Sequence, residues 1–181
     1  MNIPTFLTLV RILLIPVIVG VQYLEPRWAC FLGSLFFVIA SLTDWFDGYL
    51  ARRLNQTTRF GAFLDPVADK VMVAVALALL IEKFNTSLVT LPALVIIGRE
   101  IVISALREWM AEMGKRTSVA VSFIGKVKTF AQMCSITLLL FAQQLGQGII
   151  GPLGIVLLVV AAILTIWSML VYIKVSWSYL N

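Results

Sequence analysis

The sequence has no histidine and little charge. Of its 181 residues two are cysteine, and only 13% are charged. The absence of histidine excludes Ser-His-Asp triads, histidine general bases and histidine metal ligands. Cys30 and Cys134 stand alone within apolar stretches, so neither a disulfide framework nor a CxxC motif is present. Any chemistry must therefore depend on carboxylates and cations.

Apolar residues make up 61% of the chain, and the mean hydropathy is +1.01. Globular domains average about 45–50% apolar residues. A soluble domain of this size cannot bury so much apolar surface, so we expect a lipid bilayer around the protein. The N-terminal segment has no basic stretch before its apolar run and no small-residue cleavage site, so we do not expect a cleaved signal peptide.

Six apolar runs are separated by short stretches of turn-forming and charged residues. Each run is near the roughly 20 residues that a membrane-spanning helix needs, and none alternates as barrel strands do. The pattern predicts an all-α integral membrane protein with six transmembrane helices in one domain, residues 1–181. The runs lie near residues 5–24, 28–50, 60–81, 88–106, 119–142 and 149–173.

Basic residues gather on one side of this predicted bundle. The first, third and fifth connections hold only Arg27 and Lys83, whereas the remaining lysines and arginines cluster near the opposite side. The positive-inside rule places that side, with both termini, in the cytoplasm. We therefore expect a multi-pass protein in contact with membrane lipid, and no nucleic-acid partner.

Four aspartates lie in SLTDWFDGYLARRLNQTTRFGAFLDPVADK, residues 41–70, between the second and third apolar runs. On a helix with about 100° per residue, the two aspartates of each run share a face with small residues that let a ligand approach the backbone. Two helices joined by a tight turn are antiparallel neighbours, so all four carboxylates can converge on one cavity. The two faces comprise Asp44, Asp47, Gly48 and Ala51, and Gly61, Asp65 and Asp69.

Four oxygen donors without histidine or cysteine favour Mg²⁺ or Mn²⁺ over zinc. Two such ions, bridged by shared carboxylates, would suit phosphoryl transfer. One alternative is a structural cluster in which the aspartates pair with neighbouring arginines. Another is that Asp65 caps a helix beginning at Pro66, but that helix would have only about 16 apolar residues. We therefore predict that the third helix begins near Thr58 and bends at the proline.

The spacing D-x2-D-G-x2-A-R-x8-G-x3-D-x3-D resembles the signature of the CDP-alcohol phosphotransferases at every fixed position. This resemblance implies a six-helix membrane enzyme, usually a homodimer, in which a divalent metal assists attack of an alcohol on a CDP-linked donor, with release of CMP. It also implies roles for the matching residues. The metal ligands would be Asp44, Asp47, Asp65 and Asp69, with Asp69 also the general base, while Gly48, Ala51 and Gly61 would make room for the nucleoside and Arg52 would lie near the diphosphate.

Basic residues in the fourth and fifth runs favour a phosphorylated alcohol as the acceptor. Arg99 and Arg107 lie about 80° apart on a helix, so both could line one cavity, and Lys126 lies near the start of the fifth run. We predict that these three residues bind the acceptor phosphate. The alternative is that they extend to lipid headgroups.

The resemblance extends over nearly the whole chain, through NIPTFLTLVRILLIP, GREIVISALREWMAEMGKRTSVAVSFIGKVKT and TIWSMLVY, to bacterial members of the family. It implies transfer of a phosphatidyl group from CDP-diacylglycerol to sn-glycerol 3-phosphate, giving phosphatidylglycerol phosphate and CMP, in the bacterial cytoplasmic membrane. Asn2, Thr5 and Arg11 would lie near the donor. Inositol phosphate, serine or phosphatidylglycerol as acceptor remains open, and a cation transporter is a more distant alternative.

Overall fold

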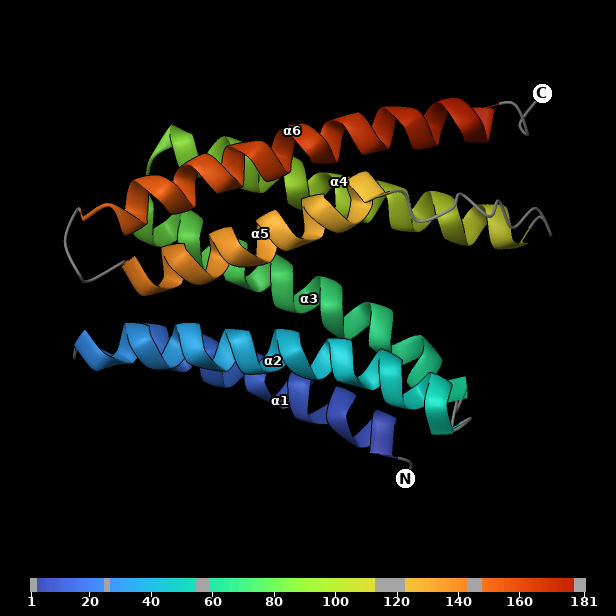
Figure 1. Ribbon diagram of the computed structural model, residues 1–181, viewed down its shortest axis with the longest axis horizontal. Helices are drawn as coiled ribbons and strands as arrows, with labels where there is room; N and C mark the ends of the chain where they lie inside the picture. The colour runs from blue at the N-terminus through green and yellow to red at the C-terminus, as the bar shows by residue number, and fades with distance from the viewer. Residues whose placement is uncertain (1–2, 25–26, 55–58, 113–122, 143–147, 178–181) are drawn as a thin grey trace.

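The computed structural model describes residues 3–24, 27–54, 59–112, 123–142 and 148–177. All regular secondary structure in these ranges is helical, and six helices run back and forth along the long axis of the molecule, as the sequence predicts (Figure 1). Their bounds are α1 Ile3–Gln22, α2 Arg27–Leu54, α3 Arg59–Phe84, α4 Ser87–Glu112, α5 Phe123–Ala142 and α6 Ile150–Trp177.

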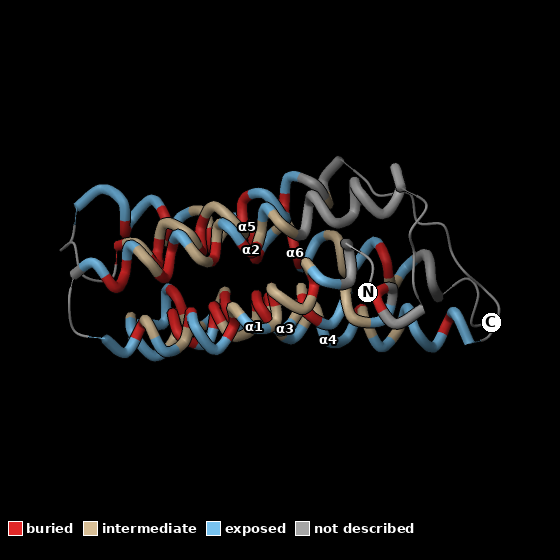
Figure 2. The backbone as a smooth tube through the Cα atoms, turned by 90° about the horizontal axis from the view of Figure 1, so that it is seen from below, coloured by how far each residue is buried: buried red, intermediate tan, exposed pale blue. Residues whose placement is uncertain are grey.

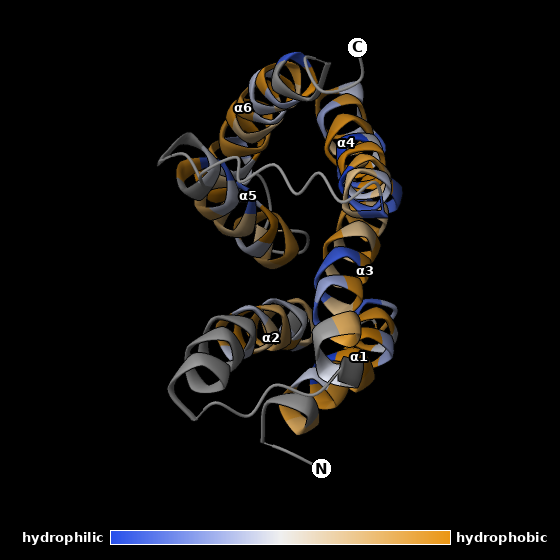
Figure 3. Ribbon diagram, turned by 90° about the vertical axis from the view of Figure 1, so that its right-hand side faces the viewer, coloured by the Kyte–Doolittle hydropathy of each residue, from blue (hydrophilic) through white to orange (hydrophobic). Residues whose placement is uncertain are grey.

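The helices form two groups, joined by α3 and by the packing of α2 on α5. Helix α1 packs on α2, while α4 and α5 both pack on α6; α3 contacts α1, α4 and α5 (Figure 3). Because successive helices are antiparallel, the starts of α1, α3 and α5 lie at the same end of the bundle as the ends of α2, α4 and α6 (Figure 1). We call this end the proximal end.

The outer surface of the bundle is apolar. In the described residues, two helical segments, Ser87–Glu112 and Ile150–Lys174, are long and apolar enough to cross a membrane. Only 22% and 28% of their most apolar windows are buried inside the molecule, unlike core helices of a soluble protein. Shorter apolar segments occur in α1, α2 and α5. Large side chains such as Leu13, Phe130 and Trp167 are exposed along the helices, and lipid would cover them.

The core follows the inward faces of the helices, where buried positions recur between exposed ones (Figure 2). Its fully buried members are mainly aliphatic side chains, with one aromatic ring, Phe37. One charged side chain, Arg11, is also completely buried. A buried guanidinium requires a compensating partner.

Helix α3 begins at Arg59 and contains Pro66 in its interior. The prediction that the helix starts before the proline is therefore confirmed, and Asp65 lies within the helix instead of capping it. At its other end, α3 passes into α4 through Asn85, whose φ of 44° is a left-handed conformation that asparagine tolerates better than most residues.

The distal end of α3 is tied to α1. The Tyr23 hydroxyl donates a hydrogen bond of 2.6 Å to the Glu82 carboxylate, and the Lys83 ammonium lies 4.6 Å from the centre of the Tyr23 ring. The hydrogen bond to Glu82 raises the pKa of Tyr23. This cluster lies at the opposite end of α3 from Asp65 and Asp69.

We expect Gly154→Ala to destabilise the packing of α6 on α5. A Cβ at this position would lie 2.8 Å from Leu139 Cγ, whereas a Cβ at Gly20, also within a helix, would meet nothing within 4 Å. Overpacking a core costs about 1–3 kcal/mol, and Gly→Ala in an open helix position gains up to about 1 kcal/mol. Thermal unfolding in detergent should show a lower Tm for Gly154→Ala and an equal or higher Tm for Gly20→Ala. An unchanged Tm for Gly154→Ala would contradict this packing.

Candidate active site

Two of the predicted site carboxylates lie on one face of α3, near the proximal end. Asp65 and Asp69 are four residues apart, so their side chains are neighbours along the helix. Each is partly exposed, and the Asp69 side chain keeps 40% of its surface accessible. Gly61, one turn before Asp65, is buried, as a position of close helix packing would be. The three predicted site residues of the third helix therefore lie near one another on α3.

Helix α1 holds both carboxylates. The Thr8 hydroxyl donates a short hydrogen bond to Asp65 Oδ1, and one guanidinium nitrogen of Arg11 lies 4.0 Å from Asp69 Oδ1. Thr8 and Arg11 are three residues apart on α1 and therefore share a face. Both side chains are fully buried. Arg11 thus provides a fixed positive charge beside Asp69, which compensates part of the cost of burying the guanidinium.

Several predicted residues lie outside the part of the chain whose side chains are described. The predicted site positions of the second helix lie within α2, and their side chains are outside the described part. Three further positions, two predicted to contact the donor and one predicted to bind the acceptor phosphate, also have side chains outside the described part. These residues are Asp44, Asp47, Gly48, Ala51 and Arg52, together with Asn2, Thr5 and Lys126.

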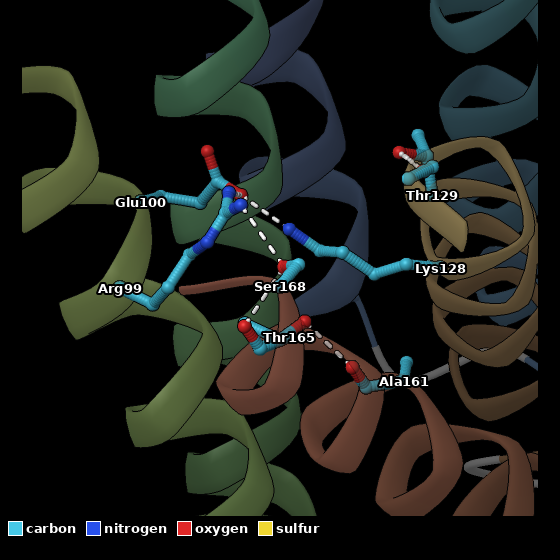
Figure 4. Close-up of polar contacts among 8 residues, drawn as sticks. Arg99, Glu100, Lys128, Thr129, Ala161, Thr165 and Ser168 are labelled. Atoms are coloured by element: carbon cyan, nitrogen blue, oxygen red, sulfur yellow. Dashed lines mark hydrogen bonds and ion pairs between the residues drawn. The ribbon is translucent and has the colours of Figure 1, made fainter. Parts of the chain in front are cut away.

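A network of charges links α4, α5 and α6 (Figure 4). Glu100 Oε1 accepts hydrogen bonds of 2.8 Å from both Arg99 on the same helix and Lys128 on α5. Arg99 also donates to the Ser168 hydroxyl on α6 at 3.2 Å. Arg99 and Lys128 point toward Glu100 from different helices, so one carboxylate positions two cations.

Arg107 does not join this network in the described structure. It lies two turns further along α4, where its guanidinium is 5.3 Å from the centre of the Tyr172 ring on α6. This distance is within the range of a cation–π contact. The sequence predicts that Arg99 and Arg107 share a cavity, and in the structure both contact α6 through separate partners.

A cavity of about 110 Å³ opens between α3, α4 and α5. It brings the Asp69 carboxylate and the Lys128 ammonium to one space, with Glu100 between α4 and α5. Lys128 is buried, and its ammonium donates a hydrogen bond to Glu100. Its side chain also lines the cavity. The lining residues are Asp69, Lys70, Val73, Glu100, Lys128, Thr129, Gln132 and Met133.

The sequence prediction missed Glu100 and Gln132 as site residues, and of the two lysines near the start of the fifth run it chose Lys126 instead of Lys128. Lys128 and Gln132 are four residues apart in an otherwise apolar helix, and Ser135 follows three residues later. Polar residues at this spacing form a stripe on one helix face. That stripe is the signal from which the lining of the cavity could have been predicted.

A second hollow, of about 170 Å³, lies between α3 and α4. It is lined mainly by aliphatic side chains, with the two charged residues Lys70 and Glu100 among them. Lys70, Val73 and Glu100 also line the polar cavity, so the two spaces adjoin. The remaining lining residues are Val71, Ala74, Ile97 and Ile101.

The carboxylates of α3 fit a hard divalent cation, since they offer partly exposed oxygens beside a polar cavity. Within the described residues, no group of three or more histidine, cysteine, aspartate or glutamate side chains could hold a metal ion. The other two predicted ligands, Asp44 and Asp47, have side chains outside that part of the chain. The metal site therefore stays a prediction.

Fold and site together define an all-α membrane protein with a carboxylate- and cation-lined cavity near one end of its helices. Its sequence matches the family model described as CDP-alcohol phosphatidyltransferase over residues 1–167. The chain belongs to this family, so the family predicted from the aspartate spacing is confirmed.

Two similar curated proteins are each named CDP-diacylglycerol–glycerol-3-phosphate 3-phosphatidyltransferase. The chain is 58% identical over 175 residues to that of Escherichia coli (strain K12), and 59% identical over 175 residues to that of Salmonella choleraesuis (strain SC-B67). In both cases the match covers 97% of this chain and 94% of the relative. The match therefore extends through all six helices.

Proposed function

We propose that this protein transfers the phosphatidyl group of CDP-diacylglycerol to sn-glycerol 3-phosphate, giving phosphatidylglycerol phosphate and CMP. The observation that carries the proposal is the cavity in which Asp69 and Lys128 meet. A phosphorylated alcohol reacts through its hydroxyl and is held by its phosphate. The cavity offers a carboxylate that can accept the hydroxyl proton and a buried cation that can bind the phosphate. The names of the similar proteins support this substrate pair.

In the proposed reaction, Asp69 accepts the proton of the acceptor's 1-hydroxyl. The hydroxyl oxygen forms a bond to the phosphorus that carries diacylglycerol, and the bond from that phosphorus to the bridging oxygen of CMP breaks. CMP leaves with the bonding electrons. Arg11 beside Asp69 keeps the carboxylate in place, and Lys128 with Arg99 balances the charge of the acceptor phosphate.

We further propose Mg²⁺ or Mn²⁺ as the cofactor, with two ions held by Asp44, Asp47, Asp65 and Asp69. When bound, such ions would neutralise the charge of the donor diphosphate. Gly48, Ala51, Gly61 and Arg52 would surround the nucleotide, as the motif implies. The short hydrogen bond from Thr8 orients the Asp65 carboxylate, and this supports a role for Asp65 as a metal ligand.

The proposal places the proximal end, with its carboxylates and most of the basic residues, at the cytoplasmic face of a bacterial inner membrane. The start of α1 and the end of α6 lie at this end, which supports cytoplasmic termini. A homodimer, as the family resemblance implies, is part of the proposal. The acyl chains of the donor would stay in lipid while glycerol 3-phosphate arrives from water.

We expect CMP release to depend on glycerol 3-phosphate. Purified protein would be incubated with CDP-diacylglycerol, Mg²⁺ and one acceptor at a time: glycerol 3-phosphate, inositol phosphate, serine or phosphatidylglycerol. The expected result is CMP release at least about tenfold faster with glycerol 3-phosphate than with the others, because the cavity pairs a base with a cation for phosphate. Faster release with another acceptor would reassign the substrate. No CMP with any acceptor, and no CDP binding, would favour a transporter.

A further inference from the structure

Gln132 is a buried polar residue on the wall of the polar cavity. It lies on α5 one turn after Lys128, only 4% of its surface is exposed, and it lines the polar cavity. Within the part of the chain that the structure describes, its side-chain amide forms no hydrogen bond. By contrast, Ser135 on the same helix is buried and donates a 2.7 Å hydrogen bond to the Gly154 carbonyl.

A primary amide offers two N–H donors and a carbonyl acceptor. Leaving these groups unpaired in a protein interior is costly, so buried amides normally bind a protein group, ordered water or a ligand. The Gln132 side chain lines the cavity, and no hydrogen bond within the described residues occupies its amide. A group that enters the cavity can therefore bind the amide.

The lining of the cavity indicates the chemistry of that partner. Gln132 lines this cavity together with Asp69 on α3 and with Lys128, one turn away on its own helix. A hydroxyl can bind an amide as both donor and acceptor, and the cavity also holds a carboxylate that can accept a proton and a cation that can bind a phosphate. The volume of about 110 Å³ suits a small polyol, since one water needs about 10–15 Å³ on this scale.

We propose that Gln132 binds the C2 hydroxyl of the acceptor, between the reacting C1 hydroxyl at Asp69 and the phosphate at Lys128. This inference rests on the proposed function and extends it: Gln132 makes the enzyme select a 1,2-diol monophosphate over an alcohol that has only one hydroxyl. A site that hydrogen-bonds a substrate hydroxyl discriminates strongly against the analogue lacking it, because the amide is then left unpaired.

The test compares sn-glycerol 3-phosphate with 3-hydroxypropyl phosphate, which lacks only the C2 hydroxyl. For the wild-type enzyme we expect kcat/KM to favour glycerol 3-phosphate by about 100-fold or more. Gln132→Leu, which keeps similar volume, should reduce this preference to less than about tenfold, while the KM for CDP-diacylglycerol changes little. Ser135→Ala is the matched control, since it removes a buried polar group of α5 outside the cavity and should keep the wild-type preference.

The outcomes separate this inference from the proposed function. If glycerol 3-phosphate supports CMP release and the preference is the same in Gln132→Leu and wild type, water fills the cavity and the inference is wrong. If Gln132→Leu does not fold, the wild-type preference decides: a value below about threefold overturns the inference. If neither alcohol supports CMP release above the rate in water, the proposed function itself fails.

Discussion

Asp69→Asn is expected to lower the rate of CMP release by at least about a thousandfold. General base catalysis alone contributes about 10²–10⁴-fold, and an amide cannot accept the proton of the acceptor hydroxyl. Asp69 is suited to this role because its side chain is partly exposed to the polar cavity, with the Arg11 guanidinium at 4.0 Å. Steady-state measurement of CMP, with both substrates at saturation, checks the prediction.

The control for this experiment is Glu82→Gln, at the other end of the same helix. The same change from carboxylate to amide is made there, where Glu82 accepts a hydrogen bond from Tyr23, far from the cavity. Glu82→Gln should keep wild-type activity. Because Asp69→Asn removes a negative charge beside the fully buried Arg11, its Tm must be measured too. A folded Asp69→Asn protein that keeps a tenth of the wild-type rate would rule out Asp69 as the base.

Arg99→Ala is expected to raise the KM for glycerol 3-phosphate by roughly 10- to 150-fold, because hydrogen bonds to charged groups contribute about 1.5–3 kcal/mol. The KM for CDP-diacylglycerol should change much less. Arg99 is held against Glu100 at 2.8 Å, so its guanidinium is positioned close to the cavity that Glu100 and Lys128 line. Kinetics with each substrate varied in turn would separate the two KM values.

Ser168→Ala is the matched control for Arg99. It removes the 3.2 Å hydrogen bond that Arg99 donates to α6 but keeps the cation and its contact with Glu100. If Arg99 binds the acceptor, Ser168→Ala should have little effect on either KM. Equal increases in both KM values after Arg99→Ala, matched by those of Ser168→Ala, would mean that Arg99 serves the packing of α4 on α6.

The helices could be predicted from the sequence because a membrane protein shows its architecture in its hydropathy. Six apolar runs correspond to six helices, and the start of α3 before Pro66 followed from the length that a span requires. The facing of Asp65 and Asp69 followed from their four-residue spacing. Both are local properties, which the periodicity of one helix is sufficient to determine.

The cavity depends on contacts between helices, which periodicity alone does not specify. Lys126 and Lys128 are about 200° apart on a helix, so they cannot share a face. The polar stripe of α5 indicates which of its faces turns inward, but the prediction did not use it and chose Lys126; in the structure Lys128 contacts Glu100. The prediction for Lys126 itself stays untested.

Arg11 illustrates the same limit. The sequence predicts that it contacts the donor, and the structure buries it completely beside Asp69. That neighbour lies 58 positions later in the chain, and no local pattern connects the two residues. Whether the donor also reaches Arg11 remains a prediction.

Three residues line both the polar cavity and the aliphatic hollow, so a lipid and a water-soluble substrate could approach each other across these side chains. Lys70, Val73 and Glu100 face the polar cavity on one side and the aliphatic hollow on the other. These shared side chains therefore separate a polar space from one lined mainly by aliphatic side chains. Charges interact more strongly in apolar surroundings, where the effective dielectric constant is lower. Substitutions at Val73 would move this boundary without altering any charged group.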